Sequence, residues 1–476
     1  MTVKHDLRRF YLDGRWVPAR HCGDFQIENP ATEQPIGVMA MGTAEDVGRA
    51  VGAARRAFPD YSRSTPTDRI ALLERALAAY QERYDEIACA IRDEMGAPIS
   101  LARGSQAGIG VGHLKTMIRI LRDFRFEERQ GSTRLILEPA GVCGMITPWN
   151  WPINQIACKV VPALAAGCTM VLKPSEYAPL SAALWADVMH EAGVPPGVFN
   201  LVYGDGPVAG ATLSAHSDID LISFTGSTRA GVEVARSAAP TVKRVHQELG
   251  GKSPNLILGD ADLAPAIRAS VRHAFQNSGQ SCNAPTRLLV PRQYQQAVET
   301  LACTAATEVS VGDPCDPATC MGPLVSRIQF DRVQQFIARG IAEGARLLIG
   351  GLGRPDGLLR GYYARPTIFT SVHNDMTIAR EEIFGPVLCI IPYDDESDAL
   401  RIANDTPYGL AAYVWTSDPA RALHISREIR AGAVHINGAD LTMEGPFGGF
   451  KRSGNGREWG IHGLREYCEL KAVVGC

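Results

Sequence analysis

The feature that most constrains the fold is a repeated alternation of short apolar runs with segments of helical periodicity. From Ala140 onward, the runs VCGMI, TMVLKP, FNLVYG, DLISFTG and RVHQELG are separated by helical patterns, including one near 181–192. A second series begins near Asn255 and includes TRLLVP, TIFTSV, VLCIIPY and AAYVWTS. Strands that alternate with helices at this spacing indicate βαβ units and mainly parallel sheets. We therefore expect two α/β domains, preceded by a helical segment over 44–96.

Composition narrows the class of partner. The 476 residues are 45% hydrophobic and carry a formal net charge of −3 without a block of like charges, so nothing indicates a nucleic-acid partner. The N-terminal stretch MTVKHDLRRFYLDGRW lacks the apolar core of a signal peptide, which favours the cytoplasm. The most apolar stretch, 153–172, is interrupted by Lys159, Pro162 and Gly167. It predicts a buried helix, a turn and a buried strand, and no membrane span.

One of the twelve cysteines stands in an unusual setting. The stretch NSGQSCNAPTR surrounds Cys282 with small and polar residues, so a sharp turn there would expose the sulfur and its backbone N–H to a cleft. A thiolate is a strong nucleophile when its pKa is lowered or a base lies nearby. For most cysteines the better interpretation is a small buried hydrophobe. With no C-x-x-C pair, and His21–Cys22 as the one directly adjacent histidine–cysteine pair, we expect neither a metal site nor a disulfide framework.

Two further motifs offer partners for such a thiol. Glu248 precedes Gly250 and Gly251 in QELGGKSP, and glycines let a backbone or ligand approach closely. This carboxylate is either a general base or a capping group on the surface. Asn150 lies between two tryptophans in ITPWNWP. Its amide could donate to a developing oxyanion together with the N–H of Cys282, or the turn could close a core.

Glycine turns indicate where a dinucleotide could bind. The stretch GDGPVAG, 204–210, has its last glycine one residue too late for the G-x-G-x-x-G fingerprint. FTGSTRAG, 224–231, follows a strand and opens a helix, so its N–H groups could hold a phosphate, and it lacks the lysine of an ATP-binding P-loop. In LKPSE, Lys173 and Glu176 stand at a strand end where a ribose diol could bind.

Seven motifs in order resemble the NAD(P)-dependent aldehyde dehydrogenase superfamily over essentially the whole chain: PWNWP, LKPSE, FTGST, ELGGKSP, GQSC, EEIFGP and PFGGFKRSGNGRE. The resemblance implies an α/β fold with a Rossmann-type cofactor domain (1–121 and 140–250), an α/β catalytic domain (251–452) and a small β bridging or oligomerisation arm (122–139 and 453–476). In the arm, GSTRLILEP would pair with the C-terminal ELKAVVG. An apolar terminal strand leaves an open edge in a monomer, so we expect a homodimer or homotetramer.

The resemblance also implies a mechanism. Cys282 would attack an aldehyde to give a thiohemiacetal, with Asn150 and the Cys282 N–H as the oxyanion hole. Hydride transfer to the nicotinamide would leave a thioester, which Glu248 would hydrolyse by activating water. The branch that transfers its acyl group to coenzyme A typically lacks this carboxylate, so a free acid is the expected product. Lys159 and Glu458 match a proton path behind the base, or form a structural ion pair.

The same resemblance assigns the cofactor contacts. They are Ile146, Thr147, Trp149, Lys173, Glu176, Gly206, Phe224, Gly226, Ser227, Leu249, Gln329, Glu382 and Phe384. Glu176 favours NAD, because a carboxylate accepts hydrogen bonds from a 2′-hydroxyl and repels a 2′-phosphate. The ammonium of Lys173 nearby could soften this preference, which leaves NADP as the second possibility.

Pocket positions give a partial indication of the substrate. They are Trp151, Cys158, Ser281, Asn283 and Phe447. Cys158 stands where several relatives have an aromatic residue, and GIGVGHLKTMI, 108–118, carries glycines and no Phe, Tyr or Trp, so both indicate a wide entrance. We expect a medium or long, fairly apolar aldehyde, with or without a distal polar group. The alternatives are a cysteine-dependent esterase or hydrolase, and a non-catalytic binding relative.

Overall fold

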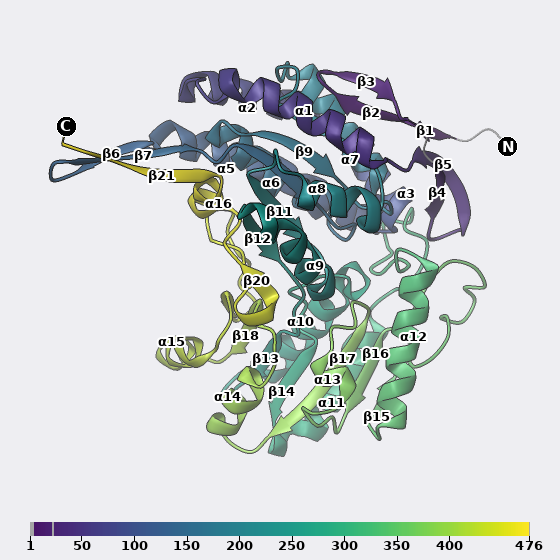
Figure 1. Ribbon diagram of the computed structural model, residues 1–476. Coiled ribbons are helices and arrows are strands. Elements are labelled where there is room, and N and C mark those ends of the chain that lie inside the picture. The colour runs from purple at the N-terminus through teal and green to yellow at the C-terminus, as the bar shows by residue number, and fades with distance from the viewer. Residues whose placement is uncertain (1–3, 21–22, 476) are drawn as a thin grey trace.

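The computed structural model describes residues 4–20 and 23–475, and their strands form two large and two small sheets (Figure 1). The pair His21 and Cys22 lies outside the described residues. In the first part of the chain, the helices are α1 (Ala44–Tyr61), α2 (Pro66–Glu82), α3 (Tyr84–Met95), α4 (Ile99–Leu101), α5 (Gly108–Asp123), α6 (Pro152–Ala166), α7 (Pro179–Glu191), α8 (Ala211–Ala215) and α9 (Thr228–Ala238). The helical segment expected over 44–96 is thus confirmed as three consecutive helices.

The first large sheet has the strand order β20-β12-β11-β8-β9-β10-β2-β3. Its strands are β2 (Arg9–Leu12), β3 (Arg15–Pro18), β8 (Val142–Ile146), β9 (Thr169–Lys173), β10 (Phe199–Leu201), β11 (Leu221–Thr225), β12 (Arg244–Glu248) and β20 (Gly454–Asn455). The run from β12 to β10 is parallel, and every residue of β8, β9 and β11 is buried, which explains their continuous apolar sequences. The apolar stretch 153–172 is confirmed as buried helix α6, a turn at Gly167, and strand β9.

The order of these strands reverses between β8 and β11. Strands β9 and β10 follow β8 on one side, whereas β11 and β12 continue on the other. In open α/β sheets, ligands bind at such a switch point, outside the carboxyl ends of the strands. Asn150 follows β8, Ser227 follows β11, and Glu248 is the last residue of β12. The topology therefore gathers three predicted site segments at one edge of the sheet.

The second large sheet has the order β15-β16-β17-β14-β13-β18-β19 and is parallel except for β15. Its strands are β13 (Pro254–Ile257), β14 (Arg287–Pro291), β15 (Arg346–Ile349), β16 (Thr367–Thr370), β17 (Val387–Tyr393), β18 (Ala411–Trp415) and β19 (Ala433–Ile436). The helices are α10 (Leu263–Phe275), α11 (Gln295–Thr307), α12 (Arg327–Ala342), α13 (Thr377–Arg380), α14 (Glu396–Asn404) and α15 (Pro419–Glu428). Gly251, Cys282 and Phe384 precede β13, β14 and β17, so this sheet contributes the amino ends of its strands.

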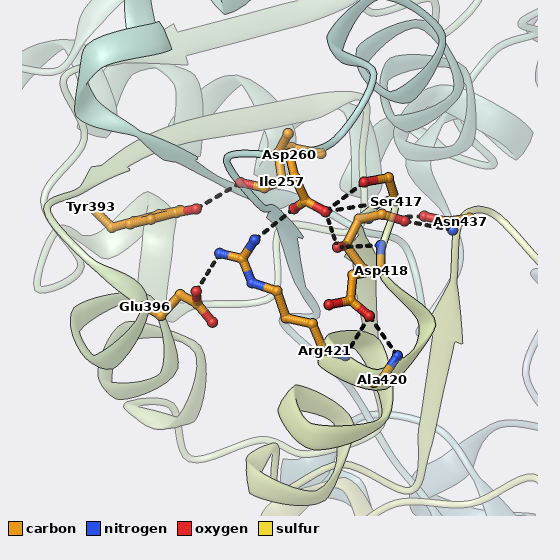
Figure 2. Close-up of polar contacts among 10 residues, drawn as sticks. Ile257, Asp260, Tyr393, Glu396, Ser417, Asp418, Ala420, Arg421 and Asn437 are labelled. Atoms are coloured by element: carbon orange, nitrogen blue, oxygen red, sulfur yellow. Dashed lines mark hydrogen bonds and ion pairs between the residues drawn. The ribbon is translucent and has the colours of Figure 1, made fainter.

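A polar cluster fixes the far ends of this second sheet (Figure 2). Asp260, beyond β13, accepts hydrogen bonds from the backbone N–H and hydroxyl of Ser417 at 3.0 and 2.8 Å. Arg421 of α15 donates to Asp260 at 2.8 Å and also pairs with Glu396 of α14. Asp418 caps α15 by accepting from the backbone N–H of Ala420 at 2.8 Å. These contacts brace β13 and β18 against two helices, away from the predicted site.

The small sheets lie at opposite sides of the molecule (Figure 1). One joins β1 (His5–Leu7), β4 (Asp24–Asn29) and β5 (Gln34–Ala40). The other is a long arm of β6 (Glu127–Gln130), β7 (Thr133–Pro139) and β21 (Cys468–Val474), which follows helix α16 (Gly460–Glu466). The pairing expected between the segment 131–139 and the C-terminal strand is confirmed by the register of β7 with β21, which is antiparallel. Among the described residues, no helix has the length and apolarity needed to cross a membrane.

Candidate active site

A cavity of about 210 Å³ lies where the carboxyl ends of the first sheet meet the amino ends of the second. The predicted site residues that line it are Trp149, Asn150, Gly226, Ser227, Glu248, Leu249, Cys282, Gln329, Glu382 and Phe384. The rings of Trp149 and Phe384 meet edge to face, with centroids 5.4 Å apart, so the two halves of the chain touch across this cavity. A larger cavity of about 740 Å³ beside α10 is lined by none of the predicted residues.

The loop that carries Cys282 has an unusual backbone. The backbone φ angles of Asn277, Ser278 and Gly279 are 53°, 57° and 71°. Residues other than glycine rarely adopt this conformation. Such strain persists only where the surroundings enforce it. Here Asn277 Nδ2 donates to the carbonyl of Asn150 at 2.8 Å, and Ser278 Oγ donates to the carbonyl of Gly322 at 2.8 Å. The loop is thereby fixed, with Cys282 partly exposed, as its polar sequence indicated.

Two adjacent glycines allow the loop after Glu248 to pack against the nucleophile. A Cβ atom on Gly251 would lie 2.4 Å from the carbonyl oxygen of Cys282, and one on Gly250 would lie 2.3 Å from Glu382 Oε2. The first contact is with the backbone and excludes a side chain at Gly251, whereas the second would force the carboxylate of Glu382 to shift. Hence the close approach that the sequence ELGGK indicated occurs, and it brings the ends of β12, β14 and β17 together.

The surroundings of the thiol decide its resting state. Burial, and then the carboxylates of Glu382 and Glu248, raise the pKa of the Cys282 thiol far above its usual value. A free enzyme therefore holds a neutral thiol at neutral pH. Of the two ways to activate a cysteine, a lowered pKa does not apply to this state, and the nearby carboxylates leave base assistance as the available route.

Asn150 stands beside the nucleophile with a donor to spare. Its Nδ2 donates to the carbonyl of Gln280 at 3.1 Å, and an amide NH₂ carries two hydrogens, so one is left for a ligand. The neighbouring Trp151 Nε1 donates to Ser281 Oγ at 2.8 Å. The turn ITPWNWP is thus tied directly to the residues that precede Cys282, which suits an oxyanion hole that must keep its position.

Behind the cavity lies a buried charged cluster. Lys159 forms an ion pair with Glu458, and their side chains are 0% and 4% exposed. Although desolvation opposes it, Lys159 keeps the pKa of Glu458 below its usual value. Glu248 is in the opposite condition, because burial and the charge of Glu458 raise its pKa well above the ordinary range. The pKa values of the two carboxylates are therefore displaced in opposite directions, as expected of an acid–base pair whose members serve different roles.

The other end of the candidate site is more open. Ser227 Oγ accepts the backbone N–H of Ala230 at 3.3 Å and caps α9, whose free N–H groups could hold a phosphate. Lys173 Nζ donates to the carbonyl of Gly204 at 2.8 Å and lies 3.8 Å from Glu176. Gln329 Nε2 donates to the carbonyl of Phe384 at 2.7 Å and so orients the loop that carries Glu382. This donor set suits the ribose and phosphates of a dinucleotide.

Six of the predicted cofactor residues lie outside the lining of the 210 Å³ cavity: Ile146, Thr147, Lys173, Glu176, Gly206 and Phe224. They stand at or just beyond the ends of β8, β9 and β11, except Gly206, which begins a π-helical turn capped by Asp205. Conversely, the lining includes Pro148, Gln155, Thr225 and Arg332, which sequence reasoning missed, and Gly250, which it had singled out as a position of close approach. Their neighbours in the motifs PWNWP and FTGST were the available signal for Pro148 and Thr225.

The substrate side differs from expectation in two respects. Cys158 is 1% exposed and its thiol donates to Glu458 Oε2 at 3.2 Å, so it belongs to the charged cluster and does not widen an entrance. A Cβ on Gly110 would lie 2.6 Å from the ring of Tyr80, so this glycine serves helix packing and adds no room for a ligand. A sequence does not show which distant residue packs against a glycine in a helix, so such a glycine can be mistaken for room for a ligand.

Aromatic side chains that the sequence did not single out lie near the remaining pocket positions. Phe447 stacks on Trp459, with ring centroids 5.5 Å apart, and His113 of α5 meets Trp459 edge to face. Asn283, next to the nucleophile, accepts a hydrogen bond at its carbonyl from the Tyr413 hydroxyl at 3.0 Å. The motif GREWG held the signal for Trp459, directly after Glu458.

Comparison with known proteins agrees with this geometry. The model of the aldehyde dehydrogenase family matches residues 16–473. A 3-succinoylsemialdehyde-pyridine dehydrogenase of a Pseudomonas species is 58% identical over 471 residues, which are 99% of each chain. A mutant of aldehyde dehydrogenase C from Pseudomonas syringae, in complex with NAD⁺ and octanal, is 52% identical with a TM-score of 0.98 and covers 98% of this chain and 96% of its own. A Mycobacterium tuberculosis aldehyde dehydrogenase in complex with NAD⁺ is 41% identical with a TM-score of 0.96, over 99% and 98% of the two chains. The chain belongs to the aldehyde dehydrogenase family.

Proposed function

We propose that this enzyme oxidises a medium or long apolar aldehyde to the free carboxylic acid with NAD⁺, through a thioester on Cys282. The observation that carries the proposal is that Cys282, Glu248 and Asn150 line one cavity, together with seven of the thirteen residues assigned to a dinucleotide. A non-catalytic binding protein would need no such set. The domain boundaries near residues 121, 140, 250 and 452 belong to the same proposal, and the change from one large sheet to the other between β12 and β13 supports the one near 250.

The chain's own residues perform the covalent steps. Cys282 loses its proton to a nearby carboxylate, and its sulfur adds to the aldehyde carbon. The spare hydrogen of the Asn150 amide and the N–H of Cys282 donate to the oxygen, which carries the developing negative charge. The bound dinucleotide supplies the hydride acceptor. After oxidation, Glu248 takes a proton from water, the hydroxyl adds to the thioester carbonyl, and the Cys282 sulfur leaves.

The cofactor assignment rests on the open end of the candidate site. Two of the solved relatives hold NAD⁺, and this chain has a carboxylate, Glu176, after β9. Ser227 at the start of α9 would receive a phosphate, and the Gln329-held loop would orient Glu382 toward the ribose. NADP remains the second choice, because Lys173 lies 3.8 Å from that carboxylate.

The substrate assignment rests on the aromatic walls. Trp151, Phe447 and Trp459 are partly exposed and offer apolar surface for an acyl chain. One structural relative was crystallised with octanal, and another relative is named for a semialdehyde joined to a pyridine ring. Both names describe an aldehyde with a sizeable apolar portion. We therefore extend the medium-chain assignment to aldehydes that carry a distal aromatic ring.

A panel assay tests the proposed function. Purified protein is mixed with NAD⁺ or NADP⁺ and with acetaldehyde, hexanal, octanal or decanal, and the absorbance of reduced nicotinamide is followed, with Cys282→Ala as the control. We expect octanal and decanal to give the highest kcat/KM, and the variant to give no reduction. A clear preference for acetaldehyde would refute the substrate class. Ester hydrolysis without any nicotinamide reduction would instead favour the hydrolase.

We also propose that the arm joins copies of this chain into a homodimer or homotetramer. Strand β21 lies at the edge of its sheet, and Leu470 and Val474 on it are 63% and 76% exposed. An exposed apolar edge strand is ready to pair with another chain. Light scattering coupled to size exclusion should give a mass of two or four chains, and Leu470→Glu should reduce it. A monomeric wild-type protein would contradict the proposal.

A further inference from the structure

A buried histidine lies beside the candidate base on the same strand. Successive side chains of a strand point to opposite faces, so His246 and Glu248 of β12 share one face. Gln247 points to the other face and donates to the carbonyl of Gly231 at 2.6 Å. His246 Nε2 lies 3.4 Å from Glu248 Oε1, and these side chains are 4% and 2% exposed. Among the described residues, Glu248 Oε2 has no hydrogen-bond partner.

The backbone of the loop at 448–456 packs closely against both groups. A Cβ on Gly456 would lie 2.5 Å from the imidazole carbon Cδ2, and one on Gly448 would lie 2.7 Å from Glu248 Oε1. Both glycines have positive φ, at 75° and 153°, so the backbone itself forms the wall. Imidazole and carboxyl group are therefore held against each other by the segment that also carries Glu458.

The charges around the pair come from several elements. Lys159 of α6, Arg457 and Glu458 act on both groups, Arg244 of β12 acts on His246, and Glu466 of α16 acts on Glu248. Burial lowers the pKa of His246 to about 4, so its ring is neutral at neutral pH. A neutral imidazole can donate one hydrogen bond, and in the tautomer protonated at Nε2 the acceptor is Glu248 Oε1.

We infer that His246 is a positioning residue for Glu248. The N–H of His246 Nε2 donates to the carboxylate of Glu248 and favours the ionised form of this carboxylate, which thioester hydrolysis requires. This inference rests on the proposed function. A base must be ionised to take a proton from water, and both burial and Glu458 oppose ionisation of Glu248. A neutral donor counters them without adding a charge that would itself need a partner. The contact is long, as catalytic hydrogen bonds often are in a free enzyme.

Two substitutions separate donation from packing. His246→Gln places an amide Nε2 at nearly the reach of the imidazole Nε2, whereas His246→Met fills similar space without a donor. If His246 only fills space, the two variants should behave alike. If it positions the base, the glutamine variant should retain hydrolysis and the methionine variant should lose it.

The experiment uses the full-length protein and 4-nitrophenyl acetate, which acylates Cys282 without a dinucleotide. Acid quenching and intact mass spectrometry give the fraction of acyl-enzyme, and release of nitrophenol gives the rates of the first and later turnovers. For His246→Met we expect the first turnover to change less than the steady rate, which should be about tenfold lower, and acyl-enzyme to accumulate. The pH at which the steady rate reaches half its maximum should rise. For His246→Gln, all of these should stay close to wild type.

The outcomes separate this inference from the proposed function. Equal behaviour of the two variants, or an unmoved pH profile in the methionine variant, would overturn the role of His246. If the wild-type enzyme itself forms no acyl-enzyme at Cys282, the proposed function fails and not only this inference. Should His246→Met not fold, His246→Asn replaces it, because its shorter amide withdraws the donor from Oε1. The same loss of hydrolysis is then expected, and wild-type rates would refute the inference.

Discussion

The candidate site has a lysine–glutamate pair at each of its two ends, outside the lining of the 210 Å³ cavity, and the two pairs are built differently. Lys159 and Glu458 come from distant segments, are buried, and bond directly to each other. Lys173 and Glu176 lie three residues apart, 3.8 Å from each other, and the glutamate side chain is 25% exposed. The first pair is complete without a ligand, whereas the second leaves carboxylate oxygens available. A closed pair is suited to setting the charge of a neighbouring base, and an open pair to contacting a ligand.

Replacing a glutamate with glutamine at each end should give the largest effects on catalysis, and the effects at the two ends should differ most. Glu248→Gln removes the base, so we expect thioester hydrolysis to fall at least about a hundredfold. The first burst of reduced nicotinamide should fall less, because the carboxylate of Glu382 remains near the Cys282 thiol. Glu176→Gln should leave hydrolysis unchanged. Stopped-flow absorbance separates burst from steady rate. Equal losses in the two variants would remove the distinction between the ends.

Stability should also distinguish the two lysines. Lys159→Met leaves the Glu458 charge buried without a partner, which costs about 3–5 kcal/mol. Lys173→Met loses one hydrogen bond and a long ion pair, for about 1–2 kcal/mol. Urea unfolding followed by circular dichroism measures both free energies of unfolding. In the double variant Lys159→Met with Glu458→Gln, part of the lost free energy of unfolding should be regained, because no unpaired buried charge remains. Similar values for the two lysine variants would contradict the comparison.

Cys282 lies where the two ends meet, and its reactivity reports on both. Because its pKa is raised, the thiolate fraction should grow about tenfold per pH unit, so alkylation by iodoacetamide should rise about a hundredfold from pH 7 to pH 9 without a plateau. Removing a nearby negative charge lowers the thiol pKa. Glu382→Gln should accelerate alkylation more than Glu248→Gln does, since Glu382 has the larger influence. Peptide mass spectrometry resolves each cysteine, and a plateau near pH 7 would contradict a neutral resting thiol.

The end of the site with Lys159 and Glu458 was harder to predict from the sequence than the end with Lys173 and Glu176. Buried parallel strands leave continuous apolar runs, so the segments after β8, β9 and β11 could be located, and with them Asn150, Glu176 and Ser227. His246 gave no signal, because one histidine in an apolar strand has no pattern of its own. Its contacts come from the loop around Gly456, more than two hundred residues away. Cys158 was misplaced for the same reason, since its partner Glu458 lies at the other end of the chain.

The smallest expected effect is on cofactor choice at the open end. Glu176→Gln removes the charge that would repel a 2′-phosphate, while Lys173 keeps its hydrogen bond to the carbonyl of Gly204 at 2.8 Å. We expect the ratio of kcat/KM for NADP⁺ to that for NAD⁺ to rise about tenfold, which corresponds to roughly 1.4 kcal/mol. Quenching of tryptophan fluorescence gives the dissociation constants, with Glu458→Gln as a control that should leave the ratio unchanged. If Glu176→Gln does not alter the ratio, the 2′-oxygen lies elsewhere, and the open pair has no part in choosing the dinucleotide.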